Sequence, residues 1–206
     1  RSTHTIVQQV ETLKQMVKAF SDYARMPKLH LHPVDLNSLI TETRDLYTHD
    51  EDETTIQLSL DENLPELEAD AGRMRQLLHN LIKNAIEAMA DLDTKHVLIS
   101  SSLSEQHGSP YIEISVSDKG PGIPEDIVGQ LFDPYVTTKP KGSGLGLAIV
   151  KKIVEEHGGI IRAENLPNGG ARIILRLPVT STQTGGTAQT NNESDTGNRN
   201  KNDAAA

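Results

Sequence analysis

The sequence has 206 residues, with 20 Lys and Arg against 29 Asp and Glu, a formal net charge of −9 and no cysteine. The lack of cysteine excludes a disulfide scaffold, a thiolate metal site and a cysteine nucleophile. The acidic balance argues against a nucleic-acid binder that works by neutralising phosphates. No apolar run approaches the roughly 20 residues that span a bilayer, so we expect a soluble chain of one or two domains.

Composition divides the chain into three parts: residues 1–27, 28–178 and 179–206. In the first part, apolar residues recur at alternating steps of four and three, which is the spacing of helices that pack lengthwise on one another. This narrow stripe favours a partner helix over packing on the chain's own domain, although the pattern leaves both open. The last part is polar, and we expect a disordered tail there. The stripe consists of Ile6, Val10, Leu13, Val17, Phe20 and Ala24.

The middle part is predicted to be one mixed domain. Apolar periodicity predicts helices near 35–46, 71–90 and 147–157, and strands at 56–60, 97–103, 111–116, 160–164 and 171–177. A further short helix is expected between the Gly- and Pro-rich stretches 118–124 and 134–146, and His30 to Pro33 is interpreted as a linker. Strands grouped with helices on one side indicate an α/β (α+β) sandwich of two layers.

Two asparagines, Asn80 and Asn84, lie one turn apart on the predicted 71–90 helix, on a polar stripe with Arg73 and Glu87. Asn is a poor former of helix interiors because its side chain competes for backbone hydrogen bonds. Either each amide satisfies a neighbouring loop, or the amide oxygens face a ligand or a hydrated divalent cation. The second interpretation suits Mg²⁺ held mainly by nucleotide phosphates.

Two glycine motifs follow. Asp118-Lys-Gly120-Pro-Gly122 comes directly after a predicted strand, where a carboxylate can accept a hydrogen bond from an exocyclic amine and glycines permit close approach of a flat ligand. Gly142-Ser-Gly144-Leu-Gly146 leads into a helix, whose free N–H groups and dipole form a phosphate cradle. Phe132, Tyr135 and Lys139 precede it, in a long loop suited to a lid that closes on a ligand.

The order of these motifs resembles that of the N, G1, F, G2 and G3 boxes of sensor histidine kinases. The resemblance covers residues 35–178 and is strongest with the nitrogen-regulation, NtrY-like subgroup, while residues 1–27 resemble the second helix of the dimerisation and phosphotransfer domain. It implies the Bergerat (GHKL) ATP-binding fold with ATP and Mg²⁺ as ligands. The matching segments are Asn80-x-x-x-Asn84, Asp118-x-Gly120-x-Gly122, Phe132-Asp-Pro-Tyr135, Gly142-x-Gly144-x-Gly146 and Gly169-Gly170.

The resemblance also implies residue roles. Asn84 would coordinate Mg²⁺, Asp118 would accept the adenine amino group, and Lys139 would neutralise the γ-phosphate. Asn80 stands where the ATP-hydrolysing relatives carry a glutamate base, and an amide cannot take a proton from water, which favours transfer over hydrolysis. Asn80 and Lys139 are thus the expected catalytic pair. The expected nucleotide contacts are Asn80, Asn84, Asp118, Gly120, Gly122, Ile123, Thr138, Lys139, Gly142, Gly144, Leu145, Gly146 and Leu147.

None of the eight histidines has the family's phosphoacceptor context, a His followed by an acid, an apolar residue, a basic residue, Asn and Pro. We therefore expect a fragment from the cytoplasmic portion of a bacterial inner-membrane sensor kinase. Its expected partners are ATP, a response-regulator receiver domain and a second copy through the N-terminal helix, without nucleic acid or membrane contact. Two alternatives stay open: a Bergerat-fold ATPase, and a nucleotide-binding, dimerising module without activity of its own.

Overall fold

The computed structural model describes residues 28–47, 54–139 and 142–179, and the single helical positions Ile6, Val7, Val10, Leu13, Lys14, Val17 and Ser21. The predicted long helices and strands are confirmed, with ends that differ by a few residues. In chain order the elements are β1 (His32–Val34), α2 (Leu36–Asp45), β2 (Thr54–Leu60), β3 (Leu67–Ala69), α3 (Ala71–Ala88), β4 (Lys95–Gln106), β5 (Ser109–Ser117), the 3₁₀ turn η1 (Val128–Gln130), α4 (Gly146–Glu156), β6 (Ile160–Asn165) and β7 (Ala171–Pro178).

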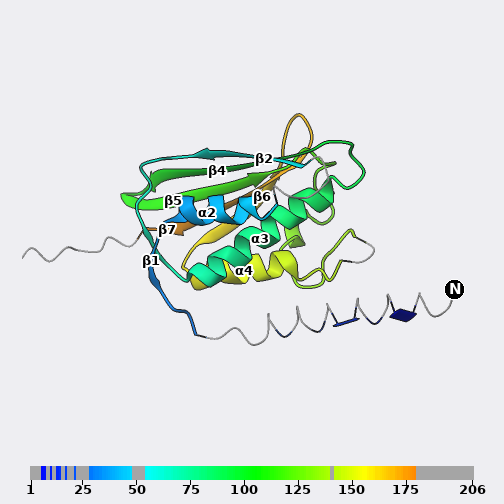
Figure 1. Cartoon of the computed structure of the whole chain (residues 1–206), viewed down its shortest axis with the longest axis horizontal. Coiled ribbons are helices and arrows are strands. Elements are labelled where there is room, and N and C mark those ends of the chain that lie inside the picture. The colour runs from blue at the N-terminus through cyan, green and yellow to red at the C-terminus, as the bar shows by residue number, and fades with distance from the viewer. Residues whose placement is uncertain are drawn as a thin grey trace, which may run out of the picture.

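Five strands form one sheet in the order β2-β4-β5-β7-β6. β2 and β4 pair in parallel, and every other neighbouring pair is antiparallel. A parallel pair needs a crossover connection, which α3 supplies here. Helices α2, α3 and α4 cover one face of the sheet (Figure 1). The two-layer α/β sandwich predicted from the sequence is confirmed.

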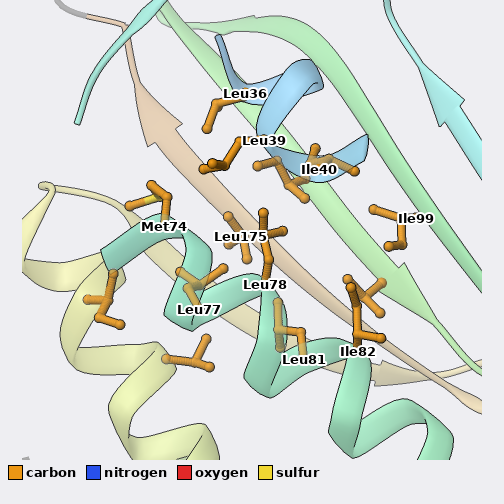
Figure 2. Close-up of a cluster of buried hydrophobic side chains, with 14 of the residues drawn as sticks. Leu36, Leu39, Ile40, Met74, Leu77, Leu78, Leu81, Ile82, Ile99 and Leu175 are labelled. Atoms are coloured by element: carbon orange, nitrogen blue, oxygen red, sulfur yellow. The ribbon is translucent and has the colours of Figure 1, made fainter. Parts of the chain in front are cut away.

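Helix α3 forms the centre of the core. Asp70 caps its N-terminus and accepts a hydrogen bond from the Arg73 N–H through its side chain. The apolar stripe of α3 packs between the other helices and the sheet, as Figure 2 shows. Because this stripe faces inward, the polar stripe with Asn80 and Asn84 faces the loops at the sheet's edge. The buried side chains include Leu36 and Ile40 of α2, Met74, Leu77, Leu78, Leu81 and Ile82 of α3, Ile99 of β4 and Leu175 of β7.

The interpretation of His30 to Pro33 as a linker was wrong. His32–Val34 form β1, which pairs antiparallel with β3, and the His30 N–H donates to the Asp70 carboxylate at 3.1 Å. His157, at the end of α4, accepts a hydrogen bond from the Asp70 N–H at 3.1 Å. A ladder of three residues is too short to show a period, which is why the sequence pattern did not reveal it.

The short helix expected between the two Gly- and Pro-rich stretches is present as a single turn of 3₁₀ helix. This turn covers Val128–Gln130. Pro124 and Pro134 bracket it and Gly129 lies within it, and both residue types disfavour a longer helix.

Four positions of the predicted N-terminal stripe are described. Ile6, Val10, Leu13 and Val17 are helical, and each side chain is 58–61% exposed. Phe20, Ala24 and the predicted tail beyond Val179 lie outside the described residues. In the described part of the chain, no helix is both long and apolar enough to span a membrane.

Candidate functional site

A cleft of about 780 Å³ opens between α3, the end of β5 and the two glycine-rich loops. Its lining brings together motifs that lie far apart in the sequence. The predicted residues among the lining are Asn80, Asn84, Asp118, Gly122, Ile123, Thr138, Lys139, Gly142, Gly144, Gly146 and Leu147.

Two predicted contact residues, Gly120 and Leu145, are not among the residues that line this cleft. Gly120 lies behind the cleft, where a Cβ would stand 2.9 Å from the Ala88 carbonyl oxygen. Leu145 is buried in the core with 1% of its surface exposed. Both residues therefore shape the cleft from behind in this structure.

Asp118 follows β5 directly and lies half-buried at the base of the cleft. Its Oδ1 accepts hydrogen bonds from the Gly120 N–H at 2.8 Å and the Ala171 N–H at 3.3 Å. Burial raises the pKa of the Asp118 carboxyl, and the two backbone donors and the Lys139 charge oppose this rise only in part. A carboxylate that is partly shielded from water binds a hydrogen-bond donor of a ligand strongly, because the donor supplies the hydrogen bond that water would otherwise make.

Glycines allow the backbone to close around Asp118. Gly170 has φ +90°, and a Cβ there would collide with the Asp118 carbonyl oxygen. Gly122 has φ +87°, and a Cβ there would stand 2.8 Å from Asn165 Oδ1. Both positions combine a left-handed backbone with a close approach, which only glycine accommodates without strain.

Asn165 is a residue that the sequence analysis missed. At the end of β6, its Oδ1 accepts from the Ile123 N–H at 2.7 Å and its Nδ2 donates to the Ile123 carbonyl at 2.8 Å. This pair of bonds fixes the loop that carries Gly122. No motif marks an asparagine that acts on the backbone of a segment 42 positions away, so only the structure reveals it.

Asn80, Asn84 and Glu87 of α3 line the cleft beside Lys139. The Lys139 ammonium donates to Asn84 Oδ1 at 3.3 Å and forms an ion pair with Glu87 at 2.5 Å. Asn80 Nδ2 is buried and has no hydrogen-bond partner within the described residues. Arg73, although on the predicted polar stripe, does not line the cleft and pairs with Glu156 at 3.3 Å.

The second glycine motif ends at the N-terminus of α4, next to Asn84. Gly144 has φ +66°, and a Cβ there would stand 2.5 Å from the Tyr135 carbonyl carbon. The Tyr135 N–H donates to the Gly144 carbonyl at 2.9 Å. This hydrogen bond joins the segment around Tyr135 to the second glycine motif. No described side chain caps the first turn of α4, so its N–H groups and dipole are available to an anion.

This donor set fits a magnesium nucleotide. An amide oxygen of Asn84 already faces a cation, the Lys139 ammonium, and the buried Asn80 amide lacks a partner within the described residues. The described residues contain no cluster of three or more His, Asp or Glu side chains that could hold a metal alone. A metal here would therefore depend on phosphate oxygens, which is how Mg²⁺ is usually bound beside nucleotides.

Comparison with known protein families matches residues 69–181 to the histidine kinase-, DNA gyrase B- and HSP90-like ATPase family. Sensor histidine kinase ZraS of Escherichia coli O157:H7 is 40% identical over 180 residues, which cover 86% of this chain and 38% of ZraS. Nitrogen regulation protein NtrY of Azorhizobium caulinodans is 37% identical over 178 residues, 85% of this chain and 23% of NtrY. The chain thus spans well under half the length of these curated relatives.

Three solved structures are similar in fold. Full-length ShkA in complex with AMPPNP aligns with TM-score 0.71 and 28% identity, over 88% of this chain and 39% of ShkA. The catalytic domain of histidine kinase ThkA aligns with TM-score 0.65 and 35% identity, over 73% of this chain and 97% of that domain. ThkA in complex with the response regulator TrrA aligns with TM-score 0.70 and 32% identity, over 85% of this chain and 50% of the ThkA chain.

Proposed function

Since this chain belongs to the histidine kinase-, DNA gyrase B- and HSP90-like ATPase family, we propose that it binds Mg-ATP in the cleft and supplies the γ-phosphoryl group to a histidine of a phosphoacceptor helix. From that histidine the phosphoryl group passes to an aspartate of a response regulator. The likeness to ZraS, NtrY and ShkA supports this proposal. In the proposal, the chain is the ATP-binding portion of a longer sensor, on the cytoplasmic side of a bacterial inner membrane.

One observation carries the proposal: the half-buried Asp118 carboxylate and the N-terminus of α4, which no described side chain caps, line the same cleft as Asn84. Asp118 accepts the adenine amino group at the base of the cleft. The N–H groups around Gly144 to Leu147 and the Lys139 ammonium bind the phosphates, because a helix N-terminus and a cation both favour negative charge. Asn84 holds Mg²⁺, which supplies charge neutralisation at the phosphates when bound.

Transfer is proposed over hydrolysis because of the chemistry of Asn80. Phosphoryl transfer depends mainly on positioning and charge neutralisation, and a neutral imidazole is already a nucleophile. Asn80 cannot accept a proton from water, but its Nδ2–H group, which has no partner within the described residues, can donate to a phosphate or a water molecule. The cleft therefore orients and neutralises ATP, while the acceptor histidine supplies the nucleophile.

Calorimetric titration with AMPPNP and Mg²⁺ tests nucleotide binding. Asp118→Asn should weaken affinity by at least about tenfold, because hydrogen bonds to charged groups contribute about 1.5–3 kcal/mol. Asp126→Asn is the matched control, since Asp126 is exposed and does not line the cleft. Equal affinities of the wild type and Asp118→Asn would contradict the adenine assignment.

Transfer is tested by mixing the chain with a separately produced phosphoacceptor helix pair of a related kinase and γ-labelled ATP. Label on the acceptor supports the kinase. Binding of AMPPNP without label transfer supports a nucleotide-binding module, and steady phosphate release without an acceptor supports an ATPase.

A further inference from the structure

The contacts of Lys139 carry an inference about the cation site. Its ammonium lies 2.5 Å from Oε2 of Glu87 and 3.3 Å from Oδ1 of Asn84. Asn84 and Glu87 are separated by three positions on α3, so their side chains share one face of the helix. Two oxygen atoms from this face therefore converge on one positive charge.

The orientation of the Asn84 amide agrees with this arrangement. Its oxygen faces Lys139, while its nitrogen lies on the side of Gly146, where a Cβ would stand 3.5 Å from Nδ2. Protein sites for Mg²⁺ commonly combine one or two carboxylates with substrate phosphates. A carbonyl oxygen and a carboxylate that already share a cation are donors of the kind that such a site uses.

We propose that Glu87 is a second residue of the cation site, and that Lys139 occupies this site only while metal and nucleotide are absent. The proposal rests on the proposed function, because Lys139 must have phosphates to move to. When Mg-nucleotide binds, Lys139 leaves Glu87 for the phosphates, and Glu87 joins Asn84 in holding the hydrated Mg²⁺. Each charge keeps a partner in both states, and because this ion pair is partly exposed, the exchange of partners costs little.

If Lys139 exchanges partners in this way, Glu87→Gln should change AMPPNP affinity in two respects. Without metal, the freed Lys139 should raise AMPPNP affinity by about two- to fivefold, the range expected for a partly exposed ion pair. With metal, the gain in affinity that Mg²⁺ gives should shrink by about tenfold, as is common when a metal's supporting residue is lost. Titration calorimetry with AMPPNP, in EDTA and in excess Mg²⁺, measures both quantities.

Two further variants separate the exchange from a general effect of charge. In a Lys139→Met background, Glu87→Gln should no longer raise the metal-free affinity, because the ammonium that it releases is gone. Lys151→Gln is the matched control: Lys151 pairs with Asp133 at 3.9 Å and does not line the cleft. This control should keep the wild-type gain from Mg²⁺.

Two results would overturn the inference: a gain from Mg²⁺ that is the same in Glu87→Gln and the wild type, or a metal-free effect of Glu87→Gln that persists without Lys139. Either result, with Asp118-dependent binding intact, leaves the proposed function standing. If the wild-type chain binds no AMPPNP with or without Mg²⁺, the proposed function fails and the inference fails with it.

Discussion

Burial and hydrogen bonding shift the pKa of the Asp118 carboxyl in opposite directions. Burial raises its pKa above the ordinary value of 3.8, although the Gly120 and Ala171 N–H groups and Lys139 stabilise the anion. In the pH range between 3.8 and the raised value, the folded protein binds more protons at this position than the unfolded chain. The free energy of unfolding therefore falls as pH rises through this range.

Asp118→Asn should remove that pH dependence. The amide oxygen can still accept the two backbone hydrogen bonds, while the cost of burying an anion is gone. We expect the variant to be more stable than the wild type at pH 7, with a difference that grows as pH rises from about 4 and then becomes constant. Urea unfolding at a series of pH values measures this difference, and a less stable variant at pH 7 would contradict the interpretation.

Asn165 acts on the loop next to Asp118 through two hydrogen bonds to the Ile123 backbone. Asn165→Ala should destabilise the protein by about 1–2 kcal/mol, since each bond contributes about 1 kcal/mol net, and should speed hydrogen exchange at the Ile123 amide. Asn168→Ala, in the exposed turn between β6 and β7, is the control. Equal exchange rates at Ile123 in both variants would show that the bridge does not hold the loop.

At the scale of elements, two helices begin with the same residue type in different surroundings. Asp35 caps α2 and accepts hydrogen bonds from the Ser38 N–H and the Ser38 hydroxyl. Asp70 caps α3 and also accepts from the His30 N–H, next to β1. Asp70 therefore joins the start of the chain's central helix to the strand that precedes it.

Replacement of these caps by alanine tests this difference. Each variant should lose about 1 kcal/mol of stability from its helix cap, measured by urea unfolding. Asp70→Ala should in addition speed hydrogen exchange in β1, because His30 loses its acceptor, whereas Asp35→Ala should leave β1 unchanged. Unchanged exchange in β1 for both variants would show that the ladder with β3 is sufficient alone.

The sequence predicted the helices and strands in which apolar residues repeat regularly over several helical turns or several strand positions. The α3 stripe and the β6–β7 hairpin are of this kind, and the order of the glycine motifs predicted which loops meet in the cleft. The β1–β3 ladder depends on pairing across the chain, which a local pattern does not encode. Asn165 and the Lys139–Glu87 ion pair were missed for the same reason, because their partners are distant in sequence.

At the scale of the whole molecule, the described N-terminal positions expose a row of apolar side chains. Ile6, Val10, Leu13 and Val17 keep the spacing of a helix-bundle seam, and each is more than half exposed. A second copy of the chain is the partner that the sequence predicts for this row.

Val10→Asp should weaken self-association by at least about tenfold, because a charge in an apolar seam is costly to bury, while AMPPNP affinity stays unchanged. Val7→Asp is the matched control, since Val7 is helical and exposed but lies off the seam. Sedimentation across a concentration series measures the dissociation constant. Equal effects of the two substitutions would contradict a role for the seam.

Asp118 and Ala171 are 53 positions apart, yet their backbones and the Asp118 carboxylate are hydrogen-bonded to one another. The chain between them, which includes the glycine motif at 142–146, therefore leaves this hydrogen-bonded pair and returns to it. Doubling the length of a flexible loop costs only about 0.6 kcal/mol of closure entropy. Insertions in the loops between Asp118 and Ala171 thus need not disturb the hydrogen bonds that join these two residues. Variation in the length of the outer loops therefore leaves the Asp118 carboxylate in place, and evolution can alter these loops without moving it.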